Sequence, residues 1–525
     1  MKDRALLFVL LFASFAYFYQ AGGWNQNSRF ALVRAITNEG TLNIDPFTNS
    51  TGDKAFYNGH YYSDKAPGLA LAAVPVVAAV RPIYRAFGGD AETYEGLALL
   101  SYLATVATAG LFTALAGVCL FTLCLELGAT RGGALFAALT FTVATPMWTL
   151  ATIFIGHGFG AALLVFAFAA AMRIGTDVAA GIGPTSPSRD VRLGAIVGFS
   201  AGWATVSEFP AVVPAVLLAL LSAVNAWPLG RARAVRVLGT LAVSALACAA
   251  VLMAYQYACF GSPFHVTYAS EIGFEGMRQG VFGVELPRMI RLRRILFGEY
   301  RGLLPLAPVL AVAPLGLIAM LWAPLKPDTT DSGTAEAVAR RRRAAIVAGL
   351  IAIYFIMLNA SYAYWEGGWS FGPRHASPAI PFLALGLAFL WTMLPTVGRW
   401  ALALASAYGC AVTLIAVSTM PLPPSDIRRP VAEFMWPAFR DGDLSLNTQT
   451  FVTYAPNRDF RGHHEPRAAF NLGMKLGLSG HASLVPLALV WIASGYGLIG
   501  AAGSRKTAPS ETKSSATSPA PRTHS

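Results

Sequence analysis

The residues best suited to chemistry lie between Trp24 and Gly68, where acidic, basic, histidine and aromatic side chains are gathered in one polar stretch. Charged residues make up only 13% of the chain, so this concentration needs an explanation. Asp45, Asp53 and Asp64 are each suited to act as a general base or as a metal ligand. A plain connector between two apolar segments rarely gathers acids, bases and turn residues so densely.

The three acids differ in their neighbours. Asp64 directly precedes Lys65, whose positive charge favours the ionised carboxylate and therefore ligand binding over proton transfer. The turn at Thr51–Gly52 is able to project Asp53 towards a desolvated cavity, where its basicity would rise. We therefore predict Asp53, and after it Asp45, as the catalytic base. Asp64 is predicted to contact an acceptor or a divalent metal, although no motif requires a metal or another cofactor.

Other residues suit the binding of a phosphate and of a sugar or isoprenoid chain. A guanidinium group binds phosphate through two parallel hydrogen bonds, and a tryptophan ring packs against a sugar face or a lipid chain. Ionisable residues near the ends of apolar segments are candidates for function by default. The phosphate ligands predicted on this ground are Arg301 and Arg374, and the predicted substrate contacts are Tyr62, His157, Glu208, Trp365 and Trp369.

The elements that must position these residues are transmembrane helices. The chain has 525 residues, of which 55% are hydrophobic, and apolar runs of about 20 residues recur along its length. Its mean hydropathy is +0.53. Alternating strands of the outer-membrane kind are absent, so we predict an all-α, polytopic bundle. About twelve spans are predicted, near 5–20, 97–125, 133–151, 156–173, 193–207, 209–225, 236–257, 303–323, 344–361, 376–395, 398–420 and 482–503.

The positive-inside rule sets the orientation of this bundle. Most loop arginines and lysines fall on one side only if Leu69–Ala86 is a juxtamembrane helix and not a span. The predicted membrane domain covers residues 1–503, with a disordered cytoplasmic tail at 504–525. The predicted extracytoplasmic loops are 21–96, 258–302 and 421–481.

One predicted outer loop is unusually basic. Residues 258–302 contain Arg288, Arg291, Arg293, Arg294 and Arg301, which the rule would place inside. Binding a phosphate on the outer face is a role that offsets this placement. The net charge of +12 also fits work beside anionic lipid or phosphate groups. Nucleic acid is not an expected partner, because no nucleic-acid motif is present.

The stretch resembles the first outer loop of GT-C glycosyltransferases, especially bacterial relatives of protein O-mannosyltransferases and lipid A aminoarabinose transferases. Arg29-Phe30 looks like the family's Arg-aromatic step, Gly40 like its glycine, and Tyr62-Ser-Asp-Lys-Ala-Pro67 like its second motif. The resemblance implies a polyprenyl-phosphate sugar donor, with Arg29 and Lys65 near its phosphate. It also implies a juxtamembrane helix after the Lys-x-Pro step.

The sequence departs from that family at one position of consequence. The family's acidic pair falls here on Gln26-Asn27, and neither side chain is a base. The expected function is still sugar transfer from a polyprenyl phosphate to a glycan, lipid or protein hydroxyl. The expected location is the outer face of a bacterial-type inner membrane. Two alternatives remain, a flippase for a lipid-linked sugar and a non-catalytic subunit of envelope glycan assembly.

Overall fold

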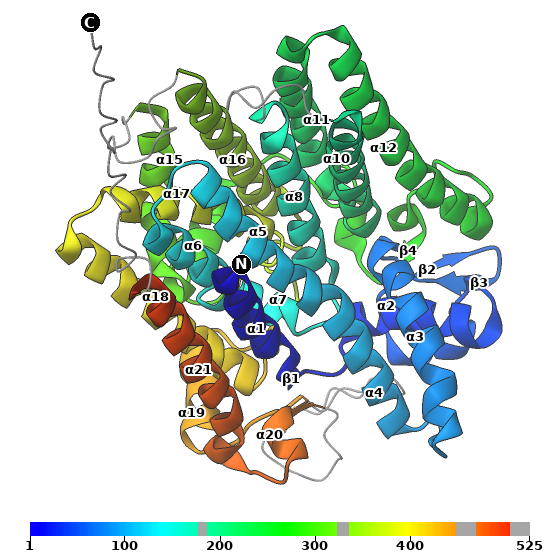
Figure 1. Cartoon of the computed structure of the whole chain (residues 1–525). Helices are drawn as coiled ribbons and strands as arrows, with labels where there is room; N and C mark the ends of the chain where they lie inside the picture. The colour runs from blue at the N-terminus through cyan, green and yellow to red at the C-terminus, as the bar shows by residue number, and fades with distance from the viewer. Residues whose placement is uncertain (177–185, 323–334, 448–468, 504–525) are drawn as a thin grey trace, which may run out of the picture.

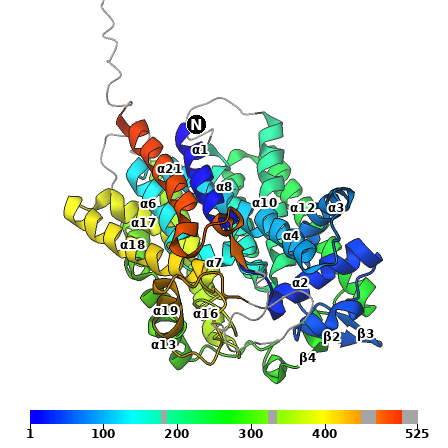
Figure 2. The same cartoon turned by 90° about the horizontal axis from the view of Figure 1, so that it is seen from below.

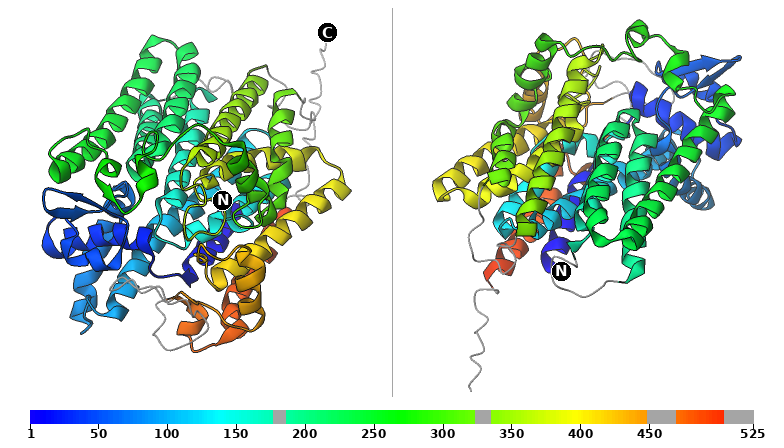
Figure 3. Two further views of the ribbon diagram at one scale, coloured as in Figure 1. Left: turned by 180° about the vertical axis from the view of Figure 1, so that it is seen from behind. Right: turned by 90° about the horizontal axis from the view of Figure 1, so that it is seen from above.

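The computed structural model describes residues 1–176, 186–322, 335–447 and 469–503, and these are mostly helical (Figure 1). The predicted tail at 504–525 lies outside the described residues, as does part of the predicted loop 421–481. The helices form one bundle, and Figure 3 shows it from behind and from above.

The first half of the bundle is built around one buried helix, α8. It spans Gly156–Arg173, and 89% of its residues are buried. Helix α10 packs closely on α12, because a Cβ at Gly194 would lie 2.2 Å from the Val237 carbonyl oxygen. Small residues of this kind allow helices in lipid to approach through their backbones. The helices are α1 (Lys2–Ala16), α4 (Tyr94–Thr105), α5 (Leu111–Glu126), α6 (Arg131–Val143), α7 (Met147–Ala151), α8, α10 (Pro187–Ser207), α11 (Val212–Ala226) and α12 (Arg231–Phe260).

The second half adds helices that close the bundle around α8. Helices α15 and α17 touch at Gly316, where a Cβ would lie 1.9 Å from the Gly386 carbonyl oxygen. The last helix returns to the first one, because Trp491 of α21 donates to Ser14 of α1 at 2.8 Å. The helices are α13 (Met289–Phe297), α14 (Leu303–Leu306), α15 (Ala313–Trp322), α16 (Ala335–Ser361), α17 (Ile380–Met393), α18 (Thr396–Ser418), α19 (Trp436–Arg440), α20 (Leu472–Lys475) and α21 (Val485–Gly503).

Eight helical segments of the described chain are long and apolar enough to cross a membrane, which makes this a multi-pass membrane protein. Helices occupy the intervals predicted as spans, but several are short. Arg131–Val143, Pro308–Trp322 and Ser377–Met393 are apolar helices below the length of a full span. The predicted total of twelve spans is therefore not shown.

Helix α3 (Gly68–Ala86) is one of these eight by length and composition, although the charge distribution predicts a juxtamembrane position. Only 22% of its apolar stretch is buried inside the protein, and the helix contains Pro75 and Pro82. It lies beside α4 and beside α2 (Trp24–Arg34), at the end of the molecule that holds the first loop (Figure 1). Its juxtamembrane position stays a prediction.

Two small sheets interrupt the predicted all-helical fold. Strand β1 (Phe18–Tyr19) pairs with β5 (Phe470–Asn471), and β2 (Lys54–Tyr57), β3 (His60–Tyr62) and β4 (Glu271–Ile272) form an antiparallel sheet of order β3-β2-β4. Asn58 and Gly59 both have positive φ, at 48° and 85°, which is typical of a tight hairpin turn. Such local turns are invisible to hydropathy, and for this reason the strands were not predicted.

The three-stranded sheet lies against the C-terminal end of α12. The rings of Tyr57 in β2 and Phe260 in α12 have centroids 5.6 Å apart. Figures 1 and 2 both show β2, β3 and β4 together at this end of the bundle. The sheet therefore joins the first predicted outer loop to the second one, because β4 belongs to residues 258–302.

Candidate active site

A cavity of about 1050 Å³ lies between the first loop and helices α8, α11, α12 and α16. Eight of the predicted site residues line it: Arg29, Asp53, Asp64, Lys65, His157, Glu208, Trp369 and Arg374. They come from segments far apart in the sequence, so the fold brings together what the sequence shows only as separate candidates. Four other predicted residues, Asp45, Tyr62, Arg301 and Trp365, do not line the cavity.

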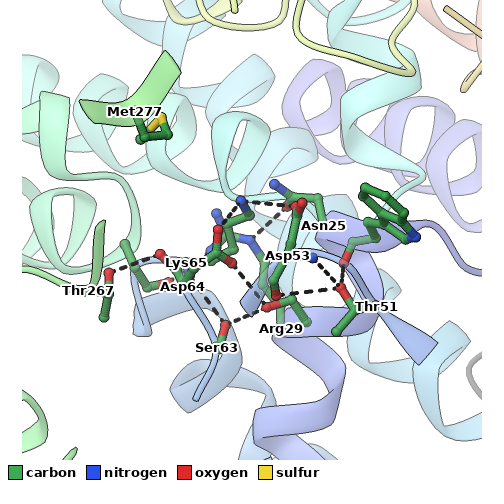
Figure 4. Close-up of polar contacts among 12 residues, drawn as sticks. Asn25, Arg29, Thr51, Asp53, Ser63, Asp64, Lys65, Thr267 and Met277 are labelled. Atoms are coloured by element: carbon green, nitrogen blue, oxygen red, sulfur yellow. Dashed lines mark hydrogen bonds and ion pairs between the residues drawn. The ribbon is translucent and has the colours of Figure 1, made fainter. Parts of the chain in front are cut away.

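The ammonium group of Lys65 is held by two carboxylates (Figure 4). Its Nζ lies 2.9 Å from Asp53 Oδ2 and 2.6 Å from Asp64 Oδ2. All three side chains are largely buried, at 13%, 8% and 2% exposure for Lys65, Asp53 and Asp64. The β2–β3 hairpin makes this pairing, because it folds the segment containing Asp64 and Lys65 back beside Asp53.

Hydrogen bonds from three hydroxyl groups fix the backbone around this pair. Ser28 of α2 bonds Ser63 at 2.8 Å, and Ser63 accepts from the backbone N–H of Lys65 at 3.3 Å. Thr267 donates to the backbone carbonyl of Asp64 at 2.9 Å. Helix α2, the hairpin and the second outer loop are thus tied together at Lys65.

Burial and neighbouring charges both shift the pKa values of Lys65 and Asp64. Burial alone would lower the pKa of Lys65, but Asp53 and Asp64 raise it above its ordinary value. Burial raises the pKa of Asp64, and Lys65 opposes this only in part. The expectation that Lys65 holds the pKa of Asp64 down is therefore wrong, because desolvation is the larger effect.

A second ion pair connects the first loop to α10 and α8. Arg29 donates to Glu208 Oε1 at 2.8 Å and to the carbonyl of Ala66 at 2.9 Å. His157, near the start of α8, lies with Nδ1 3.5 Å from Glu208 Oε2. A larger residue at position 156 would crowd this carboxylate, because a Cβ at Gly156 would lie 2.1 Å from Glu208 Oε1 and 2.9 Å from the Ser207 carbonyl oxygen.

Arg374 makes no ion pair with any described residue, unlike Arg29 and Lys65, and it lines the cavity, unlike Arg301. Its Nε is buried and lacks a hydrogen-bond partner in the described chain, and the side chain lines the cavity. Burial lowers the pKa of Arg374, whereas Asp53 and Glu208 raise it, so these acids face it across the cavity. Arg374 is thus a cation placed to receive an anion.

Arg301 supports the segment that contains Arg374 but does not reach the cavity. Its side chain is 0% exposed and donates to the carbonyl of Gly368 at 2.9 Å. The guanidinium also lies 4.2 Å from the ring centroid of Tyr300. Trp365 lies nearby and also misses the cavity, with Arg294 5.6 Å above its ring centroid. Both are placed to position the cavity wall and not to touch a ligand inside it.

Asp45 and Tyr62 also do not line the cavity. Asp45 accepts from the backbone N–H of Tyr61 at 2.6 Å, and its other oxygen lies 2.7 Å from His60 Nδ1. Tyr62 packs on Phe260 with ring centroids 5.2 Å apart. Asp45 therefore closes the loop before β2, as its turn-like sequence allowed, while Asp53 stands in the cavity.

The side-chain amides of Gln26 and Asn27 make hydrogen bonds that a carboxylate could not make. Gln26 donates to the carbonyls of Ala21 and Gly22 at 2.6 and 2.7 Å and accepts from the N–H of Phe154 at 2.8 Å. Asn27 donates to the carbonyl of Ser50 at 2.6 Å. A carboxylate has no proton to donate to these carbonyls and would be left unpaired.

Several cavity residues were not predicted from the sequence. Glu271, Tyr268, Tyr362 and His375 all line the cavity. His375 directly follows Arg374, so the prediction of Arg374 could have drawn attention to His375 as well. Glu271 had no such signal, because only the pairing of β4 with β2 brings it to the site.

No group of three or more His, Cys, Asp or Glu residues in the described chain has the spacing to hold a metal ion. Asp64, the predicted metal contact, is engaged by Lys65 and lies 3.4 Å from the Ser28 hydroxyl. A divalent ion at Asp64 therefore stays a prediction.

No family model matches the sequence, and no curated protein matches it. Solved structures show similarity at low identity. ArnT from Cupriavidus metallidurans bound to undecaprenyl phosphate is 18% identical over 84% of this chain and 70% of that chain, with a TM-score of 0.47. The apo state of the same protein gives 16% identity over 95% and 74%, with a TM-score of 0.48.

A third similar structure is the oligosaccharyltransferase AglB from Archaeoglobus fulgidus, in complex with an inhibitory peptide and a dolichol-phosphate. The identity is 13%, over 78% of this chain and only 55% of that chain, with a TM-score of 0.45. ArnT is a lipid A aminoarabinose transferase, and both proteins are GT-C membrane glycosyltransferases. The chain described here is similar in structure to these GT-C glycosyltransferases.

Proposed function

We propose that this protein transfers a sugar from a polyprenyl-phosphate donor to a hydroxyl group on the extracytoplasmic face of the membrane. The observation that carries the proposal is the lining of the cavity, which contains charged residues and apolar residues; we call the two groups its charged end and its apolar end. Arg374, with no ion pair in the described chain, stands at the charged end together with Lys65 and Arg29. An anion that brings a long apolar chain fits both ends at once.

The apolar end of the cavity reaches the lipid-facing side of the bundle. It is lined by Leu164 of α8, Val212 of α11, Met253 of α12 and Phe355 of α16. Val212 and Met253 are 49% and 36% exposed, so the lining continues to the outside of the helices. A lipid chain in this end would leave its phosphate beside Arg374 and its sugar towards the first loop.

The proposed transfer is a direct displacement at the anomeric carbon. The acceptor oxygen forms a bond to that carbon while the bond to the phosphate oxygen breaks, and the electron pair leaves with the phosphate. Arg374, Lys65 and Arg29 stabilise the charge that grows on the phosphate. Asp53 and Asp64 take up two of the three N–H donors of the Lys65 ammonium group, so one donor remains for the phosphate.

A carboxylate of the cavity receives the proton of the acceptor hydroxyl. Of the two bases predicted from the sequence, Asp53 lines the cavity, and Asp45 is bound to the backbone of Tyr61. The proposal therefore favours the cavity acids over Asp45.

The test is release of polyprenyl phosphate from a labelled polyprenyl-phosphate sugar by the purified protein, in the presence of a membrane extract as acceptor. We expect release together with transfer of the label to the extract. Movement of intact donor across a vesicle membrane without release would instead indicate a flippase. Donor binding without either process would indicate a non-catalytic subunit.

A further inference from the structure

Glu271 is an acid that the sheet places in the cavity. It is the first residue of β4 and stands opposite Ala55 of β2. Asp53 lies two residues before Ala55, and side chains two residues apart on an extended chain share a face. Ala55 is also opposite Tyr62 of β3, and Asp64 lies two residues beyond Tyr62. Asp53 directly precedes β2 and Asp64 follows β3 by two residues, so both acids flank the sheet near Glu271, and all three line the cavity.

The bonding of these three acids differs. Asp53 and Asp64 each have an oxygen within 2.9 Å of Lys65 Nζ. Glu271 has a buried Oε1 with no hydrogen-bond partner in the described chain, and the residue lines the cavity. A buried carboxylate oxygen without a partner is costly, so the site is built for a donor that arrives with a substrate.

Taken with the sugar transfer proposed above, on which it rests, this geometry leads to a specific assignment. We propose that Glu271 is the catalytic base, whose free oxygen accepts the proton of the acceptor hydroxyl as that oxygen bonds to the anomeric carbon. Asp53 and Asp64 then hold and orient Lys65 for the departing phosphate. The proton ends on Glu271 and the electron pair of the broken bond ends on the phosphate.

The electrostatic surroundings of Glu271 suit this role. Burial raises its pKa to about 7, with Asp64 and Asp53 adding to the rise and Lys65 and the backbone N–H of Phe274 opposing it. The cavity also contains Arg29, Arg374, Glu208 and Glu366. Lys54, opposite Ile272 in the sheet, bonds the carbonyl of Thr48 instead. A base whose pKa lies near neutral pH is efficient at taking a proton from a hydroxyl group.

The experiment compares Glu271→Gln, Asp53→Asn and a control, Glu275→Gln, in full-length purified protein. Glu275 lies in the same outer loop but is exposed and does not line the cavity. The donors are labelled hexose, pentose and N-acetylhexosamine on undecaprenyl phosphate, with a membrane extract as acceptor. Undecaprenyl phosphate release measures turnover, and binding of unlabelled undecaprenyl phosphate measures folding of the donor site.

We expect Glu271→Gln to lower kcat by roughly 10²- to 10⁴-fold while undecaprenyl phosphate still binds. Asp53→Asn should lower it less, and Glu275→Gln should leave it unchanged. In the wild type, kcat/KM should rise with pH up to about pH 7 and then level off, because only ionised Glu271 is a base. In Glu271→Gln, kcat/KM should no longer rise with pH in this range. Glu271→Asp should keep part of the turnover.

The outcomes separate this inference from the proposed function. If the wild type releases undecaprenyl phosphate and Glu271→Gln does so at the same rate with the same pH profile, Glu271 is not the base. If Asp53→Asn is the slower of the two variants, the base is Asp53. If the wild type releases none from any donor, the proposed transfer fails, and the assignment of Glu271 fails with it.

Discussion

The ammonium group of Lys65 lies between two buried carboxylates, which use two of its three N–H donors and leave the third for a phosphate. Such an arrangement holds the side chain in place before the donor arrives, which is the condition for electrostatic stabilisation of a leaving group. It also explains why a single lysine stands beside two acids. With Lys65 absent, Asp53 and Asp64 would face each other as like charges.

Lys65→Ala should therefore weaken binding of undecaprenyl phosphate by roughly 1.5–3 kcal/mol, the range for a lost charge-assisted bond. Lys65→Arg should not restore it, because a planar fork does not present its donors as an ammonium group does. Lys54→Ala is the matched control, since Lys54 bonds the carbonyl of Thr48 and does not line the cavity. Equal affinity of wild type and Lys65→Ala would place the phosphate elsewhere.

Arg374→Ala should weaken binding of the same lipid by a similar amount, roughly 1.5–3 kcal/mol, because its guanidinium is the cavity cation without an ion pair in the described chain. Arg399→Ala serves as the comparison. Arg399 donates to the carbonyl of Trp391 and does not line the cavity. Titration of fluorescent undecaprenyl phosphate into the purified variants measures the difference, and an unchanged affinity for Arg374→Ala would contradict the assignment.

At the scale of elements, the segment from Trp365 to His375 places Arg374 through two consecutive glycines. Gly367 and Gly368 have φ of 72° and 62°, a region that costs other residues about 1–2 kcal/mol. The carbonyl of Gly368 is fixed by Arg301, which is 0% exposed. Arg301 thus acts on the site through the backbone, at a distance from the ligand.

The two glycines offer a matched pair of substitutions. A Cβ at Gly367 would lie 3.0 Å from Arg374 Cγ and Nε, whereas a Cβ at Gly368 would meet nothing within 4 Å. Gly367→Ala and Gly368→Ala should therefore lower the melting temperature alike, because their backbone strain is similar. Only Gly367→Ala should also weaken binding of undecaprenyl phosphate, by a few-fold. Equal binding by the two variants would show that the position of Arg374 is not critical.

A site residue could be predicted from the sequence only where its own segment marks it as unusual. Asp53 and Lys65 were each predicted because they lie in one polar loop, but their ion pair depends on the β2–β3 hairpin, which was not predicted. His157, Glu208 and Arg374 were found as ionisable residues at the ends of apolar segments. Glu271 was not, because a two-residue strand from a distant loop has no periodicity to detect. Arg301 was placed at the phosphate because burial beneath a turn cannot be seen in composition.

For the whole molecule, contacts gather the basic residues at one end of the bundle. Arg131, at the start of α6, pairs with Asp3 at the start of α1 at 2.8 Å. Arg340, near the start of α16, donates to the carbonyl of Met172 at the end of α8. Arg233 of α12 pairs with Asp190 of α10 at 2.9 Å. The positive-inside rule predicts that this end is cytoplasmic.

Helix α12 runs from this basic end to the sheet of the first loop, and its length gives the distance between them. Its 30 residues rise about 1.5 Å each, or about 45 Å in all. Its last residue, Phe260, packs on Tyr57 and Tyr62 of the first-loop sheet. We therefore predict that the first loop and the basic end lie on opposite sides of the membrane, with the cavity on the side of the first loop.

The orientation can be tested with one cysteine at each end. The five native cysteines are buried or half-buried, so they should react poorly with an impermeant thiol reagent. Asn49→Cys, exposed in the short helix that precedes β2, should react in intact cells because the first loop faces outward. Ala232→Cys, exposed in the first turn of α12, should react only after the cells are permeabilised. The reverse pattern would invert the molecule in the membrane, and the cavity with Lys65, Arg374 and Glu271 would then meet cytoplasmic substrates instead of extracytoplasmic ones.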